Sequence, residues 1–486
     1  MRTSIHGQWS SRWIFILAAT GSAVGLGNIW RFPYLTGENG GGAFVLVYLL
    51  CVIMMGIPIM MAEILLGRRG RKSPINTMET LAAEEGLNPN WRFLGWLGVL
   101  AGFIILSYYS VIAGWTIAFI FKTGMGDFVG ANAEQTTTIF SELISSPGIL
   151  LFWHSIFMFI TIRVVSRGVS GGLERAVKFL MPALFVLLLV MVGYAMSTEK
   201  FLDGLKYLFI PDFNSLAEKN LFSDVFLPAL GQAFFSLSIG MGAIMIYGSY
   251  LSKDSSITSN CFVIAIADTS VAILAGIAIF PIVFTYGLDP SDGPGLIFIS
   301  LPIAFGQMPF GTFFGCLFFI LLMFAAWTSS ISLLEPAVTW LVESKKMSRI
   351  KASYIAGFIA WLLGVLTALS FNYWAFEFSF AGAIKQNGLF DIFDILTSNI
   401  MLPLGGVLVA IFTSWLMSRK STVDELGLGD SIAYKIWRFT IRYIAPIGVL
   451  IIFLNSIIVF IFWLTVLFKI LFILKINSLG SKGFGK

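Results

Sequence analysis

An apolar segment near the N-terminus is long enough to cross a bilayer, yet small and polar residues interrupt it halfway. At positions 21–28, inside the apolar run 13–35, the chain reads Gly-Ser-Ala-Val-Gly-Leu-Gly-Asn. In hydrocarbon, an unwound backbone is stable only where protein or a polar cavity satisfies its N–H and C=O groups. Glycines can instead form packing notches between helices. The break favours a buried site for a polar ligand, with a packing notch as the alternative.

The composition is that of a protein that crosses a membrane many times. Of the 486 residues, 57% are hydrophobic and 12% are charged, and the mean hydropathy is +0.88. Apolar runs of helix length fall at 13–35, 41–66, 92–122, 149–166, 175–196, 225–250, 260–286, 311–342, 350–371, 391–416 and 436–468. The stretch 443–474 is long for one span and short for two, which leaves eleven or twelve spans open. We expect an all-α polytopic membrane protein with about eleven transmembrane helices.

The loops indicate the orientation in the membrane and give no sign of a nucleic-acid partner. Lys and Arg gather in 67–91, 343–349 and 417–435, which predicts that these loops and the N-terminus face the cytoplasm. The net charge of +5 is divided among these clusters and does not predict a nucleic-acid partner. All three cysteines lie in apolar runs and no glycosylation sequon occurs, which favours a bacterial or archaeal inner membrane. The outer loop 287–310 is expected to carry a short helix, and His154 to lie near a helix end.

A second interrupted segment lies in the sixth apolar run. Residues 236–242 read Ser-Leu-Ser-Ile-Gly-Met-Gly. The first and sixth runs occupy matching positions in two five-helix halves, 13–196 and 225–416, with 436–468 as an extra C-terminal span. Paired glycine-interrupted segments of this kind predict an inverted-repeat transporter with its site near the midplane of the membrane.

These motifs, in this order, resemble the neurotransmitter:sodium symporter family of the bacterial leucine-transporter fold. The link between paired helix breaks and inverted repeats is itself known from this family, so it is not independent support. The chain looks most similar to the bacterial transporters of several hydrophobic amino acids. The resemblance rests on Gly25-Leu26-Gly27-Asn28, Trp30-Arg31-Phe32-Pro33, the segments 38–44 and 231–238, and Thr328-Ser329-Ser330. It implies a single transporter domain with a 5+5 inverted-repeat fold, and import of hydrophobic L-amino acids with Na⁺ by alternating access. The alternatives are an amino-acid sensor that does not transport, or a symporter of another osmolyte or an amine; an enzyme is not expected.

The resemblance also implies a substrate site at the two breaks. Its residues would be Ser22, Ala23, Gly25, Leu26, Gly27, Ile105, Tyr109, Phe235, Ser236, Ser238, Met241, Ser329 and Leu333. The substrate carboxylate would meet the N–H groups of Leu26 and Gly27 and the Tyr109 hydroxyl. Amine-carrying members have an aspartate at the position of Gly25, so a substrate of this chain should bring its own carboxylate. The deformable and apolar walls predict broad selection among hydrophobic side chains.

The resemblance also implies two sodium ions, and the residues fit this implication because Na⁺ prefers oxygen ligands. The first site would use Ala23, Asn28, Ser236 and Asp268, and the second Gly21, Val24, Ala325, Thr328 and Ser329. Chloride-dependent members have asparagine where this chain has Asp268, and a serine at Ala272. The carboxylate should therefore make transport independent of chloride, and a proton taken up by the empty carrier would add proton antiport.

Gates and a hinge complete the expected site. The outer charged pair would be Arg31 and Asp394, above Tyr109 and Phe235. The inner gate would use Trp9, Tyr250 and Glu343; His6 stands where the family has its arginine, which makes Arg12 an alternative partner. In the fifth span, Gly172 and Pro182 match a pattern that lets the helix unwind, with a merely kinked helix as the alternative. The preferred amino acid and the oligomeric state stay open.

Overall fold

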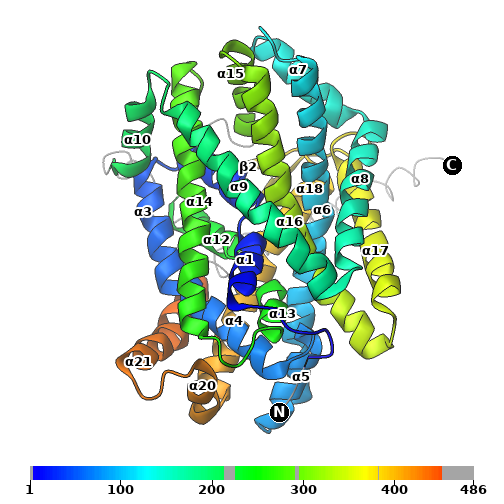
Figure 1. Cartoon of the computed structure of the whole chain (residues 1–486), viewed down its shortest axis with the longest axis vertical. Coiled ribbons are helices and arrows are strands. Elements are labelled where there is room, and N and C mark those ends of the chain that lie inside the picture. The colour runs from blue at the N-terminus through cyan, green and yellow to red at the C-terminus, as the bar shows by residue number, and fades with distance from the viewer. Residues whose placement is uncertain (1–3, 213–224, 291–294, 381–382, 451–486) are drawn as a thin grey trace, which may run out of the picture.

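The structure is a computed structural model that describes residues 4–212, 225–290, 295–380 and 383–450. The described chain is almost entirely helical, since helices satisfy their own backbone hydrogen bonds in lipid. Figure 1 shows long helices, among them α14 (Ile257–Thr285), α16 (Gly311–Lys345) and α6 (Arg92–Met125), running from one end of the molecule to the other. The short helix α1 (Arg12–Ala23) lies at the centre of that view, and both α14 and α16 pack against it.

The other elements follow in chain order. The remaining α-helices are α2 (Phe32–Glu38), α3 (Gly42–Cys51), α4 (Ile57–Gly70), α5 (Pro74–Glu84), α7 (Ala133–Ser145), α8 (Pro147–Val165), α9 (Glu174–Ala195), α10 (Phe201–Phe209), α12 (Leu227–Ser236), α13 (Ala243–Ser249), α15 (Leu301–Gln307), α17 (Arg349–Ser370), α18 (Gly388–Ile395), α19 (Leu402–Ile411), α20 (Arg419–Leu426) and α21 (Ile432–Phe439). Short turns of other helical type are η1 (Gly27–Arg31), η2 (Val52–Gly56), η3 (Pro89–Trp91), η4 (Val169–Leu173), η6 (Leu296–Ser300), η7 (Leu396–Met401), η8 (Phe412–Leu416) and η9 (Thr440–Ile444). Strands β1 (Phe378–Phe380) and β2 (Ala383–Lys385) pair antiparallel, with Phe378 opposite Lys385.

The membrane-spanning segments agree with the predicted pattern. Within the described residues, eight helices are long and apolar enough to cross a membrane, and α1 with the helix at 27–38 forms a ninth span bent by 52°. The sixth predicted span is divided into α12 and α13, each too short to cross alone. The predicted C-terminal span 436–468 overlaps α21 and η9, and its part after residue 450 lies outside the described residues. The choice between eleven and twelve spans therefore lies outside the described residues.

The two breaks have local causes. Helix α1 ends where Val24 turns to an extended conformation with ψ of 110°. In the second break Ser238, Gly240 and Gly242 have positive φ angles of 54°, 83° and 73°. A Cβ at Gly240 would also lie 2.6 Å from the carbonyl oxygen of Leu402. Glycine is needed at 240 both for its backbone conformation and for this close approach.

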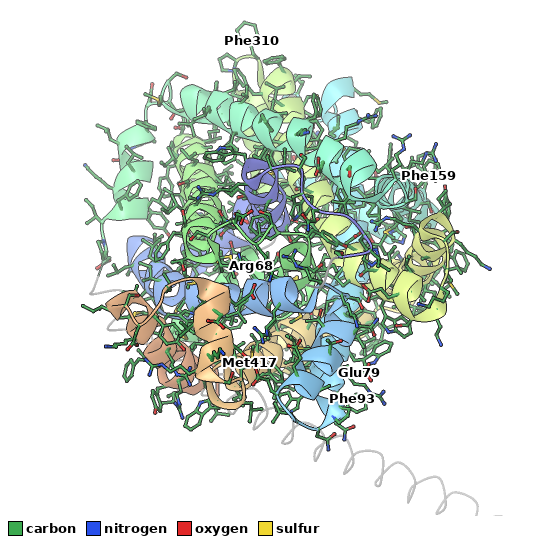
Figure 2. All side chains as sticks on the ribbon, turned by 60° about the horizontal axis from the view of Figure 1, so that its bottom comes forward. Arg68, Glu79, Phe93, Phe159, Phe310 and Met417 are labelled. Carbon is green, nitrogen blue, oxygen red and sulfur yellow. The ribbon has the colours of Figure 1, made fainter. Side chains whose placement is uncertain are left out.

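The end of the molecule that carries α5 and α20 has buried charged side chains, whereas its rim has exposed apolar ones. Figure 2 shows the end that carries α5 and α20, where Arg68 lies near the middle and its Nε is 2.6 Å from a carboxylate oxygen of Glu425. Phe159, at the rim of the same view, is 59% exposed, as suits a side chain that faces lipid. The short helix expected in the outer loop is present at Leu296–Gln307.

The position predicted for His154 is wrong. It lies well inside α8, fully buried, and its Nε2 is 3.1 Å from the carbonyl oxygen of Trp361. Gly364 on α17 makes this possible, because a Cβ there would lie 2.4 Å from the imidazole ring.

Candidate functional site

A narrow cavity with a free volume of about 20 Å³ lies where the two helix breaks face each other. Its lining consists of Ser22, Ala23, Gly25, Gly27, Ile105, Tyr109, Phe235, Ser238, Met241, Ser329 and Leu333. These are the predicted substrate residues except Leu26 and Ser236. Leu26 contacts the cavity residue Tyr109, and Ser236 neighbours Phe235 in the chain. The structure thus brings together residues from four predicted spans.

One side of this cavity is polar and closely fitted. The backbone N–H of Leu26 donates to the Tyr109 hydroxyl oxygen at 2.9 Å. A Cβ at Gly25 would lie 2.5 Å from that hydroxyl and 2.6 Å from Ser329 Oγ. The backbone at position 25 can therefore pack this closely against Tyr109 and Ser329 only because it has no side chain.

Hydrogen bonds join the two broken segments to each other. Ser238 Oγ donates to the carbonyl oxygen of Ser22 at 2.8 Å, and Gln232 Nε2 donates to the carbonyl oxygen of Gly27 at 2.7 Å. On the far side, Ser22 Oγ donates to Ser332 Oγ at 2.7 Å. Gln232 and Ser332 were not among the predicted site residues, although Gln232 lies in the motif 231–238.

The opposite side of the cavity is apolar. Ile105 and Leu333 face it from α6 and α16, and Met241 faces it from the unwound stretch between α12 and α13; all three are buried. The ring of Phe235 covers it, and the guanidinium carbon of Arg31 lies 5.0 Å from the centre of that ring, a cation–π distance.

A fully buried cluster of Asn28, Ser236 and Asp268 lies beside the cavity. Asn28 Nδ2 donates to Asp268 Oδ1 at 2.8 Å and to Ser236 Oγ at 3.0 Å, and Ser236 Oγ donates to Asp268 Oδ2 at 2.6 Å. An intramembrane carboxylate is costly, and such residues commonly mark ion or proton pathways. Three of the four residues predicted for the first sodium site, Asn28, Ser236 and Asp268, thus contact one another.

The residues of the predicted second sodium site also converge. Ser329 Oγ donates to the carbonyl oxygens of Val24 at 3.2 Å and Gly21 at 3.4 Å. Thr328 Oγ1 instead donates back to its own helix, to the carbonyl oxygens of Phe324 and Ala325 at 3.1 Å. A hydroxyl that donates in this way keeps lone pairs that can accept a cation.

The outer pair is not in direct contact. Arg31 and Asp394 both contact Ser398: the distance is 3.5 Å from Arg31 Nη1 to Ser398 Oγ, and 2.9 Å from that oxygen to Asp394 Oδ1. In this conformation Ser398 separates the two charges, a role that the sequence did not indicate.

At the inner gate, Glu343 pairs with His6, one of the two partners that the sequence left open. Glu343 accepts from His6 Nε2 at 2.9 Å, from the Ser73 hydroxyl at 2.6 Å and from Asn76 Nδ2 at 2.7 Å. The alternative anchor Arg12 is wrong, because Arg12 donates to Asn260 and Ser259 on α14. His6 therefore takes the place expected of the family's arginine.

Trp9 and Tyr250 lie together beneath the cavity. Trp9 donates from its backbone N–H to the carbonyl oxygen of Tyr250 at 3.1 Å and from Nε1 to that of Tyr247 at 3.0 Å. The Tyr250 hydroxyl donates to Glu335 Oε1 at 2.7 Å, and Arg349 Nη2 lies 2.5 Å from Glu335 Oε2. Glu335 and Arg349 were missed, since in the sequence they are a lone acid within a span and one member of a basic cluster.

The predicted hinge in the fifth span is wound in this conformation. Gly172 lies in the π-type turn η4, and a Cβ there would lie 2.1 Å from the carbonyl oxygen of Val164. Pro182 lies inside α9. π-type turns are frequent at functional sites, so the local geometry is compatible with a hinge.

The chain matches known proteins over most of its length. A profile described as the sodium:neurotransmitter symporter family matches residues 6–128 and 132–467. An uncharacterized sodium-dependent transporter of Bacillus subtilis, YhdH, is 36% identical over 93% of this chain and 97% of its own length. The human sodium- and chloride-dependent taurine transporter is 27% identical over 88% of this chain and 74% of its own length.

A solved structure agrees with the fold. The crystal structure of MhsT in complex with L-phenylalanine superposes with a TM-score of 0.84, at 44% sequence identity, over 93% of this chain and 99% of the MhsT chain. The predicted fold class, an all-α membrane protein of the leucine-transporter type, is confirmed.

Proposed function

Because this chain belongs to the sodium:neurotransmitter symporter family, a family of multi-pass membrane transporters and not of enzymes, we propose that it imports hydrophobic L-amino acids together with Na⁺ by alternating access. One observation carries the choice of substrate. The cavity at the helix breaks has the backbone of Gly25 and Gly27 and the Tyr109 hydroxyl at one side, and apolar walls at the other.

The polar side suits a carboxylate. Backbone N–H groups at the start of a half-helix attract anions, and Leu26 and Gly27 lie at the start of η1. The Tyr109 hydroxyl, which now accepts from Leu26, can turn its own proton toward a substrate oxygen. Gly25 supplies no carboxylate of its own, which favours an amino acid over an amine.

The apolar side suits a hydrocarbon or aromatic side chain. Met241 can adapt to ligands of different shape, and one methylene more or less changes binding by only ~1–3 kcal/mol in such a pocket. The structural match to MhsT with L-phenylalanine supports this class of substrate. We expect leucine, isoleucine, valine, methionine, phenylalanine, tyrosine and tryptophan to bind.

Two sodium ions fit the oxygen-rich clusters on either side of the first break. Asn28, Ser236 and Asp268 with the carbonyl oxygen of Ala23 would hold the first ion, after the Asn28 amide turns its oxygen inward. The carbonyl oxygens of Gly21, Val24 and Ala325 with Thr328 and Ser329 would hold the second. The ions are transported with the substrate, so their release to the cytoplasm completes the cycle.

The fixed charge of Asp268 supports independence from chloride. Its carboxylate supplies within the first cluster the negative charge that chloride would otherwise bring, and Ala272, one turn along α14, offers no hydroxyl to an anion. The N-terminus and the ends of α4 and α16 would face the cytoplasm of a bacterial or archaeal cell, because Lys and Arg gather there.

A binding panel tests this proposal. The purified chain would be titrated with each common amino acid in NaCl and in KCl, and thermal stabilisation would be measured, since a ligand that binds only the folded protein raises the midpoint. We expect stabilisation by the hydrophobic set in sodium alone. Stabilisation by amines but not by their parent amino acids would contradict the assigned substrate class.

A further inference from the structure

A buried carboxylate at the start of α9 binds the N-terminal segment. Glu174 is 3% exposed, and both of its oxygens accept from one residue: Oε1 from the backbone N–H of Ser10 at 2.8 Å, and Oε2 from Ser10 Oγ at 2.9 Å. Ser10 directly precedes Ser11, the N-cap of α1. Burial of a carboxylate is unfavourable unless it is hydrogen-bonded, so this contact depends on Ser10 staying in place.

Glu174 is also next in the chain to the proposed hinge. Glu174 follows η4 directly, and η4 contains Gly172. Gly172 is packed against the end of α8, where a Cβ would lie 2.1 Å from the carbonyl oxygen of Val164. A change in the winding of η4 must therefore rotate or displace the Glu174 side chain, which is only one residue beyond the turn.

Ser10 in turn is adjacent to Trp9, whose two hydrogen bonds to the carbonyl oxygens of Tyr247 and Tyr250 fasten the N-terminal segment to the end of α13. We propose that Glu174 is a positioning residue that couples the winding of η4 to the release of the N-terminal segment. While η4 is wound, Glu174 holds Ser10, and with it Trp9, against α13. When η4 unwinds, the carboxylate leaves Ser10 and α1 is free to move away.

This inference deepens the proposed alternating-access cycle and rests on it. The neighbouring cation contributes little to the coupling: Lys178 Nζ is 3.8 Å from Glu174 Oε2, and the lysine side chain is more than half exposed. Exposed ion pairs of that kind add little stability. Lys178 is therefore a matched control on the same helix face, one turn away.

Hydrogen–deuterium exchange of the full chain in lipid nanodiscs tests the coupling without any amino acid present. The exchange of a peptide covering residues 5–12 and of one covering 166–176 would be compared in NaCl and KCl. In the unaltered protein, we expect both peptides to exchange faster in KCl, and together. In Glu174→Ala, the first peptide should exchange at least about tenfold faster in NaCl, as expected for the loss of the two charge-assisted hydrogen bonds from Ser10, while the second keeps its response to sodium.

Three further variants sharpen the result. Glu174→Gln keeps an acceptor for the Ser10 N–H, so residues 5–12 should be better protected from exchange than in Glu174→Ala. Ser10→Ala removes only the hydroxyl contact and should raise the exchange of residues 5–12 less than Glu174→Ala does. Lys178→Met should exchange like the unaltered protein. Sodium protection of residues 5–12 that persists in Glu174→Ala, or independent exchange of the two peptides in the unaltered protein, would overturn the inference. Because no substrate is used, an error in the substrate class leaves this result unaffected.

Discussion

At the scale of single residues, the absence of a side chain at position 25 decides what can bind. An aspartate there would set a second carboxylate against that of an amino acid, and its Cβ would press on Tyr109 and Ser329. Gly25→Asp should abolish leucine binding and favour phenethylamine, whose ammonium it could pair. Gly25→Asn has the same shape without the charge, so it should bind neither ligand. Retained leucine affinity in Gly25→Asp, measured by calorimetry, would refute the position assigned to the carboxylate.

Met241 sets the size of the apolar side. A phenylalanine there should overpack the narrow cavity and cost ~1–3 kcal/mol for the largest ligands, so that tryptophan and phenylalanine are weakened more than valine. Met241→Leu conserves volume and serves as the control. Competition binding with the three amino acids measures the ranking, and an equal loss for all of them would mean that Met241 does not contact the substrate side chain.

Asp268 links the ions to the return of the empty carrier. With sodium bound, its charge is compensated; once the ions leave, only hydrogen bonds from Asn28 and Ser236 remain, and a proton would compensate the buried charge instead. We expect the rate of uptake to be independent of chloride and to increase under an outward-directed proton gradient. Asp268→Asn should lose that stimulation and most of its uptake, and Asp268→Asn with Ala272→Ser should regain some uptake when chloride is added. A proton response that survives in Asp268→Asn would exclude this role.

The sequence predicted the site best where neighbouring residues of one segment all contribute groups to it. Ser22, Ala23, Gly25 and Gly27 were predicted together from the family resemblance, and they line one cavity because unwinding brings neighbouring backbone groups to one place. Glu174, Glu335 and Ser398 could not be assigned, since each contacts a residue that is far away in the chain. Their pairing depends on how helices are rotated and shifted against each other, which apolar spacing alone does not determine.

At the scale of helices, the fifth span offers the clearest test of motion. Pro182 leaves one backbone carbonyl of α9 without its usual partner, which lowers the cost of unwinding. Pro182→Ala should restore that hydrogen bond, slow turnover severalfold and leave sodium-dependent substrate affinity nearly unchanged. Leu188→Ala, a buried substitution elsewhere in α9, controls for general destabilisation. If turnover in Pro182→Ala equals that of the unaltered protein, the helix is merely kinked there.

Helix breaks were predictable and helix packing was not. The composition of residues 21–28 and 236–242 marks both interruptions, and both are present. The burial of His154 could not be seen, because it depends on Gly364 from a helix more than two hundred residues further along. The inner partner of Glu343 was likewise left open until the N-terminal segment could be followed to His6.

At the scale of the whole molecule, the charge that moves per cycle distinguishes the possible ion couplings. Two Na⁺ with a zwitterion carry two charges inward, which at ~2.3 kcal/mol per charge per 100 mV amounts to roughly 4.6 kcal/mol of driving force. If one proton leaves in exchange, a single charge moves and about half of that remains. The ratio of current to labelled leucine flux in voltage-clamped proteoliposomes should be one or two, and electroneutral uptake would exclude both versions.

The most direct test of sodium-coupled import is accumulation of labelled leucine by proteoliposomes that contain the purified chain. With an inward sodium gradient we expect leucine to rise well above its external concentration, and with potassium in place of sodium we expect no accumulation. Binding in sodium without accumulation would identify a sensor instead. Uptake that continues undiminished in sodium-free medium would contradict the account as a whole.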